Sequence, residues 1–87
     1  MYQIIVHRRA VRYMQSLAAK EKERIKNSLA QLASNPLSFP SIKPMSGQWN
    51  GYYRIRLGDK RIIFWVDHDN KTVYVDHVGP RGDVYKN

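Results

Sequence analysis

Three arginines near the middle of the chain are spaced in a way that could bind phosphate. Residues 52–66 read YYRIRLGDKRIIFWV, and residue types alternate on both sides of the Gly-Asp pair at 58–59. A Gly-Asp pair between alternating runs predicts a β-hairpin with a two-residue type II′ turn. In that register Arg56 lies directly opposite Arg61, and Arg54 is next along the same face. Guanidinium groups match phosphate oxygens in geometry and charge, so this face is a candidate anion site.

The two faces of the predicted hairpin differ in character. One is apolar and is expected to join the core: Tyr53, Ile55, Leu57, Ile62, Phe64 and Val66. On the other face Tyr52 and Trp65 flank the arginines and offer ring surfaces for stacking bases. Like charges opposite one another destabilise a sheet, so the arginines are either screened by water or given an anion. The hairpin alone does not decide between a solvated strand face and a binding site.

The net charge of the chain indicates what kind of partner it binds. The 87 residues include 15 Lys and Arg against 7 Asp and Glu, a formal net charge of +8. Such an excess predicts a polyanionic partner: a nucleic acid, a ribosome or an acidic protein. There are no cysteines, which excludes disulfides and thiolate metal sites. The three histidines, His7, His68 and His77, lack metal-ligand spacing, so we expect no metal and no cofactor.

Length and hydropathy predict one soluble, cytoplasmic domain spanning residues 1–87. With 43% hydrophobic residues, the chain is long enough to bury a modest core. No apolar run approaches the length of a membrane span, and the N-terminus lacks the apolar segment of a signal peptide.

A strand and two helices are expected before the hairpin. Residues 2–7 (YQIIVH) form a short apolar run without alternation, which predicts an interior strand buried on both faces. Residues 8–17 and 20–33 have the periodicity of amphipathic helices, and Pro36 ends the second. Each helix has an apolar stripe that should face the core: Val11, Met14 and Leu17 in the first, and Ile25, Leu29 and Leu32 in the second.

Residues 37–50 are predicted to be a long loop between the second helix and the hairpin. The segment contains Pro40, Pro44 and Gly47, and long loops in compact domains are often functional or mobile. Lys43 and Trp49 could contact a partner here. For Trp49, capping the edge of the core is the favoured interpretation.

The hairpin is followed by a turn at residues 67–70 and a last strand at 71–78. The tail at 79–87 brings Arg81 and Tyr85 close to the hairpin if sequential strands are neighbours. The resulting order, β-α-α-β-β-β, predicts an α+β domain with one mostly antiparallel sheet and a helical hairpin on one face.

Two segments resemble a known family. Residues 51–61, GYYRIRLGDKR, and residues 78–85, VGPRGDVY, follow a helical hairpin in this order. The combination covers nearly the whole chain and resembles the RelE/ParE superfamily of bacterial toxins. RelE-like members are ribosome-dependent endoribonucleases, or mRNA interferases, that cut mRNA in the A site and are silenced by an antitoxin. ParE-like members poison DNA gyrase and lack the RNase residues.

The resemblance implies a set of site residues and partners. The RelE pattern has basic or aromatic residues at five positions that match here: Arg54, Arg56, Arg61, Arg81 and Tyr85. This match favours RelE over ParE. Further candidates for RNA contact are Lys43, Trp49, Tyr52 and Lys60. The implied partners are an acidic antitoxin, the ribosome and A-site mRNA, and the implied effect is inhibition of translation.

The chain departs from the RelE pattern at the position of the general base. Well-known RelE-type sites have lysines where Arg54 and Arg56 stand, and a lysine can be made neutral by its surroundings. Arginine stays charged, with a pKa above about 12, so the identity of the base is open. His77 is the nearest histidine, but its parity with Val73 and Val75 favours a place at the core edge. A gyrase poison and a non-catalytic single-strand RNA-binding module remain as alternatives.

Overall fold

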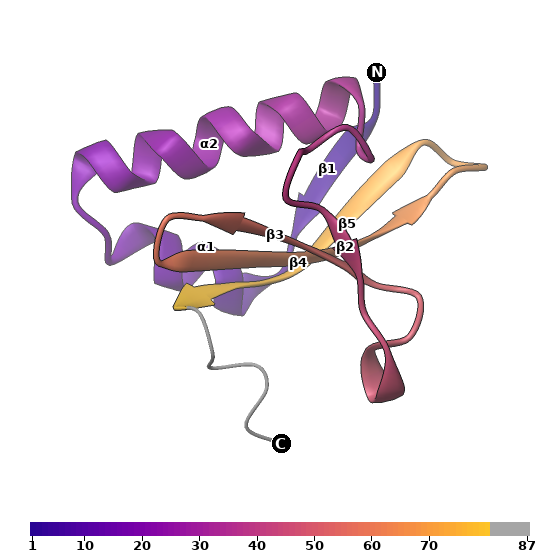
Figure 1. The fold of residues 1–87 in the computed structure, drawn as a ribbon. Helices are drawn as coiled ribbons and strands as arrows, with labels where there is room; N and C mark the ends of the chain where they lie inside the picture. Colours follow the sequence, from indigo (N-terminus) through magenta and orange to yellow (C-terminus); the bar gives the residue numbers. More distant parts are fainter. Residues whose placement is uncertain (81–87) are drawn as a thin grey trace.

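The computed structural model describes residues 1–80, which form two helices and a five-stranded sheet (Figure 1). The elements in chain order are β1 (Gln3–Val6), α1 (Arg8–Gln15), α2 (Ala19–Ser34), β2 (Lys43–Pro44), a short 3-10 helix (Gly47–Trp49), β3 (Tyr53–Leu57), β4 (Lys60–Asp67) and β5 (Thr72–Pro80). The predicted β-α-α-β-β-β order is confirmed, with the two-residue β2 as an addition. No helix in the described range is long and apolar enough to cross a membrane.

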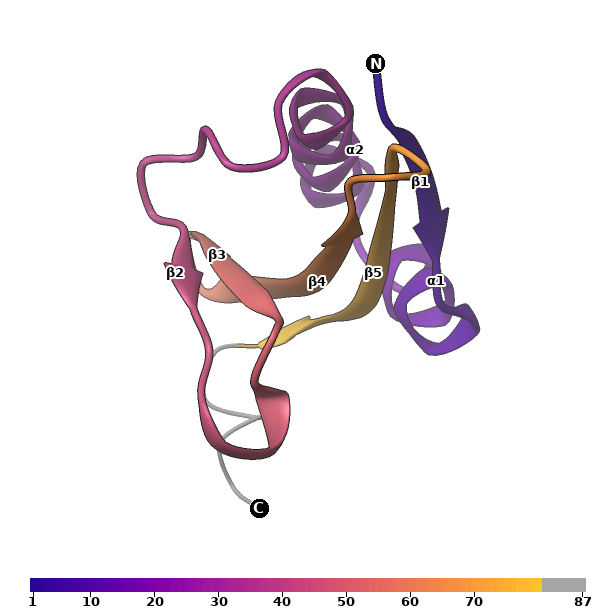
Figure 2. The same ribbon diagram turned by 90° about the vertical axis from the view of Figure 1, so that its right-hand side faces the viewer.

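The strands lie side by side in the order β1-β5-β4-β3-β2. Only β1 and β5 run parallel, and every other neighbouring pair is antiparallel. Figure 2 shows β2 and β1 at opposite edges, with both helices near the β1 side. The prediction of a mostly antiparallel sheet is confirmed.

The central hairpin has the predicted register. Arg56 pairs with Arg61, Ile55 with Ile62 and Tyr53 with Phe64 across β3 and β4. Gly58 has a φ of +62°, and Asp59 is not among the residues with positive φ. A positive φ at the first central position alone is the pattern of a type II′ turn, which glycine adopts without strain.

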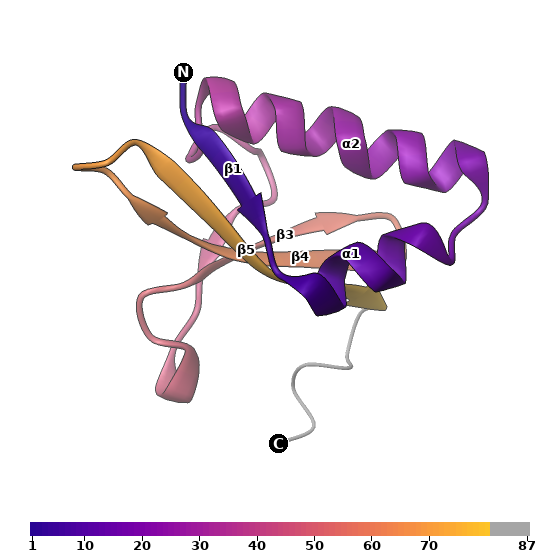
Figure 3. The same cartoon turned by 180° about the vertical axis from the view of Figure 1, so that it is seen from behind.

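The first strand is an edge strand, so the prediction of an interior strand was wrong. It pairs only with β5, and Figure 3 shows it at the margin of the sheet, leading into α1. Its residues alternate between exposed and partly buried, and Ile5 is 46% exposed. An apolar run without alternation does not by itself distinguish a doubly covered strand from an edge strand with one exposed isoleucine.

The helices cover one face of the sheet, as predicted. The side chain of His7 accepts a hydrogen bond from the amide of Arg9 at 3.0 Å and so caps α1, and α2 ends directly before Asn35 and Pro36. One stripe residue was wrong: Val11 is exposed, whereas Ala10 is buried against β5.

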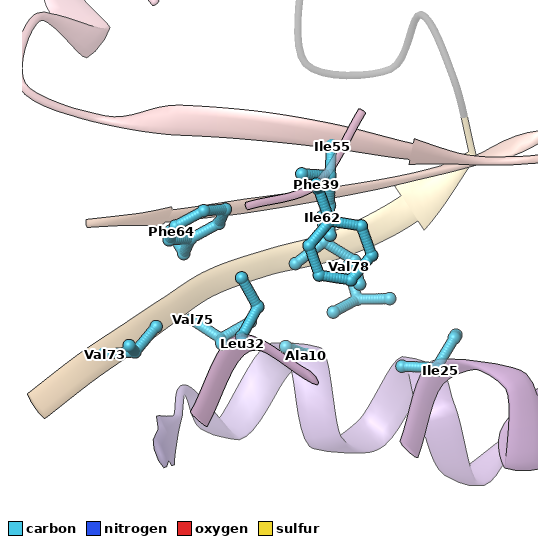
Figure 4. Packing of buried hydrophobic residues seen from close by; sticks show 10 residues of the cluster. All are labelled: Ala10, Ile25, Leu32, Phe39, Ile55, Ile62, Phe64, Val73, Val75 and Val78. Carbon is cyan, nitrogen blue, oxygen red and sulfur yellow. The ribbon is translucent and has the colours of Figure 1, made fainter. Parts of the chain in front are cut away.

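The main core lies between the helices and this face of the sheet (Figure 4). Its buried members are Ala10, Ile25, Leu32, Phe39, Ile55, Ile62, Phe64, Val73, Val75 and Val78. The partly buried Tyr53, Leu57 and Val66 pack against it, so the predicted apolar face of the hairpin is confirmed.

The segment predicted as a plain loop instead runs along the hairpin. Its two-residue strand β2 pairs with β3, and Phe39 and Met45 on either side of β2 are buried. Ser41 also connects this segment to β3, because its hydroxyl accepts a hydrogen bond from the amide of Arg56 at 3.1 Å. Proline and glycine signals mark the chain reversals here, but a two-residue edge strand is too short to leave a periodic pattern.

Candidate functional site

The predicted arginine face lies on the side of the sheet opposite the main core. Arg56 and Arg61 are direct cross-strand partners, and Arg54 lies next along β3, opposite Ile63. On the outer side, Lys43 of β2 pairs with Arg54. The backbone therefore brings four cationic side chains from three adjacent strands onto one face. Such a concentration of charge needs an anion or water to offset its repulsion.

Two of the three arginines are buried, which corrects the expectation of a fully solvated or exposed face. Arg54 is 6% exposed and Arg61 is 3% exposed, whereas Arg56 is open to solvent. For Arg54 the cause is the segment before β2, because its Nη1 donates to the backbone oxygen of Ser41 at 3.3 Å. Within residues 1–80, neither Arg54 nor Arg56 forms an ion pair with a carboxylate.

A small apolar cluster forms a wall beside the arginines. Ile63 points away from the helices yet is 0% exposed, because it is buried together with Met45 and contacted by Trp49 and Tyr52. The Trp49 and Tyr52 rings meet edge to face with centroids 5.0 Å apart. This packing supports the favoured interpretation that Trp49 caps a core edge. Tyr52 remains half-buried beside the arginine face, where part of its ring is accessible.

The second aromatic of this face is already stacked on a neighbour. Trp65 and Tyr74 lie parallel, with ring centroids 4.4 Å apart and planes 13° from each other. One face of the Trp65 indole is therefore occupied, although the side chain is still 36% exposed. Any base that stacks on Trp65 has only the outer face of the indole available.

Lys60 is set apart from the arginines, contrary to the expectation that it contacts RNA. It lies opposite Leu57 on the helix-covered side of the hairpin and is buried. Its Nζ is 2.6 Å from Glu21 of α2 and 3.1 Å from Asp59. The hydrogen bond that Lys60 donates to Glu21, followed by the one it donates to Asp59, raises the pKa of Lys60. The lysine thus joins α2 to the hairpin turn.

His77 lies at the edge of the main core, as predicted, because it lines a cavity together with Ala10 and Tyr13 of α1. Its strand register nevertheless differs from the simple alternation with Val73 and Val75. Phe64 pairs with Val75, but the preceding Ile63 pairs with His77, so one extra residue of β5 sits between them. Such a bulge reverses the side to which the following residues point. The alternation of the sequence gives no sign of a bulge at this point. The only residue in this strand that signals an irregularity is Gly79, two residues after His77.

The ring of His77 lies over Gly79, the residue directly opposite Arg61. A Cβ built on Gly79 would stand 2.7 Å from Nε2 of His77, and Gly79 is the cross-strand partner of Arg61. The imidazole therefore occupies the space that a side chain at residue 79 would fill. This puts a titratable group beside the arginine pair.

The sequence and the fold resemble those of known toxins. A family model described as the ParE toxin of the type II toxin-antitoxin system parDE matches residues 4–85. The chain belongs to this toxin family. It is a toxin of the type II toxin-antitoxin class within the RelE/ParE superfamily.

Several relatives of this toxin carry the name RelE. In the crystal structure of an archaeal RelE-RelB complex from Pyrococcus horikoshii OT3, the matching chain is 28% identical, with a TM-score of 0.82 and coverage of 94% of this chain and 97% of that one. The isolated E. coli RelE toxin is 24% identical, with a TM-score of 0.75 and coverage of 98% and 92%. A protein of Methanocaldococcus jannaschii recorded as a candidate RelE1 toxin is 24% identical over 88 residues, covering 99% of this chain and 97% of its own.

Two of the expected site residues of the toxin, Arg81 and Tyr85, lie outside the described residues. The last described strand ends beside the site, because Gly79 pairs with Arg61 and Pro80 with Lys60. Within residues 1–80, no three His, Cys, Asp or Glu side chains gather in a way that could hold a metal ion.

Proposed function

We propose that this toxin is a ribosome-dependent endoribonuclease that cleaves mRNA in the A site and so inhibits translation. One observation carries the proposal: Arg56 and Arg61 face each other on the side of the sheet opposite the main core, with Arg54 alongside. These are positions at which RelE-like toxins have basic residues. A gyrase poison that acts only by binding protein has no need of a cationic cluster of this kind.

In the proposed reaction the 2′-OH of the RNA attacks its own 3′ phosphate and expels the 5′ oxygen. Negative charge builds up on the phosphate oxygens as the pentacoordinate state forms. Arg56, Arg61 and Arg81 would stabilise this charge, and one such donor is worth about 3 kcal/mol, roughly a hundredfold in rate. Tyr85 would stack on the substrate or hydrogen-bond to it. Lys43 and Tyr52 flank the arginines and are proposed to contact the neighbouring nucleotides.

The ribosome is proposed to supply part of the catalysis. Holding an mRNA in a bent conformation places the 2′-OH in line with the phosphorus, and orientation of this kind lowers a barrier by several kcal/mol. The toxin would add the cationic groups. Free RNA, which is not held in this conformation, should therefore be a poor substrate.

An acidic antitoxin is the proposed protein partner. The formal net charge of the toxin is +8, and complementary charge accelerates association. The Pyrococcus horikoshii relative was crystallised as a complex of RelE with RelB. We expect the product of the neighbouring reading frame to co-purify with the toxin and to protect cells that express it. A toxin gene that is harmless alone and yields no co-purifying partner would contradict this part of the proposal.

Gyrase poisoning is the second candidate, favoured by the ParE description of the family model. A single experiment separates the candidates: purified toxin is incubated with translating ribosomes, and the 5′ ends of the mRNA are mapped. New 5′ ends within A-site codons support the RNase. Intact mRNA together with gyrase-dependent DNA breaks would establish the gyrase poison instead. Intact mRNA with RNA binding alone would leave only a binding module.

A further inference from the structure

We propose that Ser41 is a positioning residue of this toxin, which holds the guanidinium of Arg54 in place within the arginine cluster. The inference rests on the proposed RNase function and deepens it. Ser41 lies just before β2, and three hydrogen bonds join it to Arg54 and Arg56 of β3. Its hydroxyl is taken up by the backbone of β3, so the serine would act through the arginines and would not touch the RNA.

Ser41 stands at the place of a strand residue, although the strand does not reach it. Lys43 pairs with Arg54, so the same antiparallel register, continued by two residues, sets Ser41 opposite Arg56. The pairing of β2 with β3 ends at Lys43, because residues 39–42 form a turn that is closed by a backbone hydrogen bond of 3.2 Å between its ends. The backbone of Ser41 therefore leaves the edge of β3.

The hydroxyl of Ser41 makes the two hydrogen bonds that the backbone of a strand partner would make. It accepts a hydrogen bond from the amide of Arg56 at 3.1 Å and donates one to the carbonyl of Arg56 at 3.3 Å. In a regular antiparallel pair these two groups bond to the carbonyl and the amide of the opposite residue. Because the side chain replaces the backbone here, the carbonyl of Ser41 can accept from another donor.

That donor is the guanidinium of Arg54. Its Nη1 donates to the carbonyl of Ser41 at 3.3 Å, and the side chain is 6% exposed. Among the residues that the structure describes, Arg54 has no carboxylate partner, so a neutral carbonyl orients it without cancelling its charge. A donor that is already oriented does not have to reorganise when charge develops on a phosphate. Ser41 thus couples the backbone of one site arginine to the guanidinium of another.

The turn that carries Ser41 is anchored on two sides. Phe39, at its start, is 8% exposed and belongs to the main core, and the hydroxyl of Ser41 ties the turn to β3. Without the hydroxyl, the carbonyl of Ser41 could turn away from Arg54, while Phe39 and β2 would keep the segment on the sheet. Both hydrogen bonds to Arg56 are exposed, so water can replace them. Loss of the hydroxyl should therefore disturb the site more than the fold.

The test compares Ser41→Ala with wild type in single-turnover cleavage on programmed ribosomes over a range of toxin concentrations. We expect the maximal rate to fall about 10- to 100-fold, as for a small misplacement of a reacting group. The half-saturating concentration and the melting temperature should stay close to wild type. Ser41→Thr keeps the hydroxyl and should restore most of the rate. Ser38→Ala is the matched control, because the Ser38 hydroxyl donates to the carbonyl of Asn35 at 2.9 Å, before the turn.

A double-mutant cycle tests whether Ser41 acts through Arg54. Ser41→Ala is combined with Arg54→Gln, which removes the guanidinium and keeps a polar side chain. If the serine acts by orienting the guanidinium, Ser41→Ala should slow cleavage no further once the guanidinium is gone. Independent effects on the rate would instead multiply, because their free energies add.

Several outcomes would overturn the proposal while leaving the RNase function intact. One is cleavage by Ser41→Ala at the wild-type rate, and another is an equal loss of rate with and without the guanidinium of Arg54. A Ser41→Ala variant that does not fold would also overturn it, because the serine would then support the fold. If Arg54→Gln does not fold, a Ser41→Thr toxin as slow as Ser41→Ala would overturn it equally. A wild-type toxin that cuts no mRNA would overturn the proposed function and this inference together.

Discussion

The cationic side chains of the central hairpin are in two different electrostatic situations. Lys60 is buried with two carboxylates, Glu21 and Asp59, within 3.1 Å of its ammonium group. Arg54 is also buried, but in the described range its one hydrogen bond is to a neutral backbone oxygen. A buried charge without a counter-ion is costly. An anion bound beside Arg54 would offset this cost, so we assign Arg54 to the proposed phosphate site and Lys60 to the fold.

Arg56 allows the clearest single-residue test of that assignment. It is exposed, so Arg56→Ala should change the free energy of unfolding by no more than about 0.5 kcal/mol. Loss of one charge-stabilising donor should nevertheless slow cleavage on ribosomes roughly a hundredfold. The comparison is Arg12→Ala, an exposed arginine on α1. Equal cleavage rates for the two variants, measured alongside thermal melts, would remove Arg56 from the site.

At the scale of elements, the ion pair between Glu21 and Lys60 joins α2 to the turn of the hairpin. Glu21→Gln should lower the melting temperature because it leaves a buried ammonium with Asp59 alone. Glu23 lies two residues further along the same helix and is exposed, so Glu23→Gln should leave the melting temperature unchanged. Since the hydrogen bond that Lys60 donates to Glu21 raises the pKa of Lys60, this stabilisation is fully present below 10.5, the ordinary value, and is lost only as the pH rises beyond it. The difference in melting temperature between wild type and Glu21→Gln should therefore stay constant from pH 7 to 10 and begin to shrink only above pH 10.5.

A second element-scale prediction tests which faces of the strands are covered. Ile62 in the centre of β4 is 0% exposed and Ile5 on the edge strand β1 is 46% exposed. Ile62→Val should cost about 0.5–1.5 kcal/mol of stability through the cavity it leaves. Ile5→Val removes the same methyl group and should stay within about 0.5 kcal/mol. Denaturant titrations of both variants check this, and similar losses would mean that β1 is covered on both faces.

The parts of the fold that local chemistry determines were predictable from the sequence. Gly58, with its positive φ, fixes the turn of the hairpin, and the turn fixes the register that places Arg56 opposite Arg61. Pro36 likewise predicted the end of α2. Each of these features depends on residues a few positions apart, so a single sequence contains the information.

Features that depend on distant pairing were not predictable. The edge position of β1 follows from its parallel contact with β5, about 70 residues later in the chain, and short apolar strands look alike at the edge and in the centre. The burial of Arg54 depends on Ser41, which has no distinguishing neighbours. The side to which His77 points follows from one extra residue in β5 relative to β4. The arginines of the candidate site were thus predicted, but the burial of Arg54 and Arg61 was not.

At the scale of the whole molecule, charge and shape act together. The helices cover one side of the sheet, and the site arginines lie on the other side, which the segment around β2 covers in part. Further basic residues lie exposed on α1 and α2, among them Arg8, Arg9, Arg12 and Lys26. In the proposed function these helical charges raise the general attraction to a polyanion, whereas the hairpin arginines contact the scissile phosphate. Charge that steers association and charge that acts in the proposed site would then lie on different elements.

This separation predicts how ribosome binding responds to salt. Each phosphate that the toxin neutralises releases counter-ions, so the logarithm of the association constant should fall linearly with the logarithm of salt concentration, by about 0.7 to 0.9 per contact. Arg56→Gln should reduce this slope by about one contact. Arg12→Gln removes the same charge from α1, away from the site, and should change both the affinity and the slope much less. The measurement is equilibrium binding to ribosomes from 50 to 300 mM KCl. Binding that does not respond to salt would contradict an electrostatic interface, and equal slopes for the two variants would show that Arg56 does not contact a phosphate.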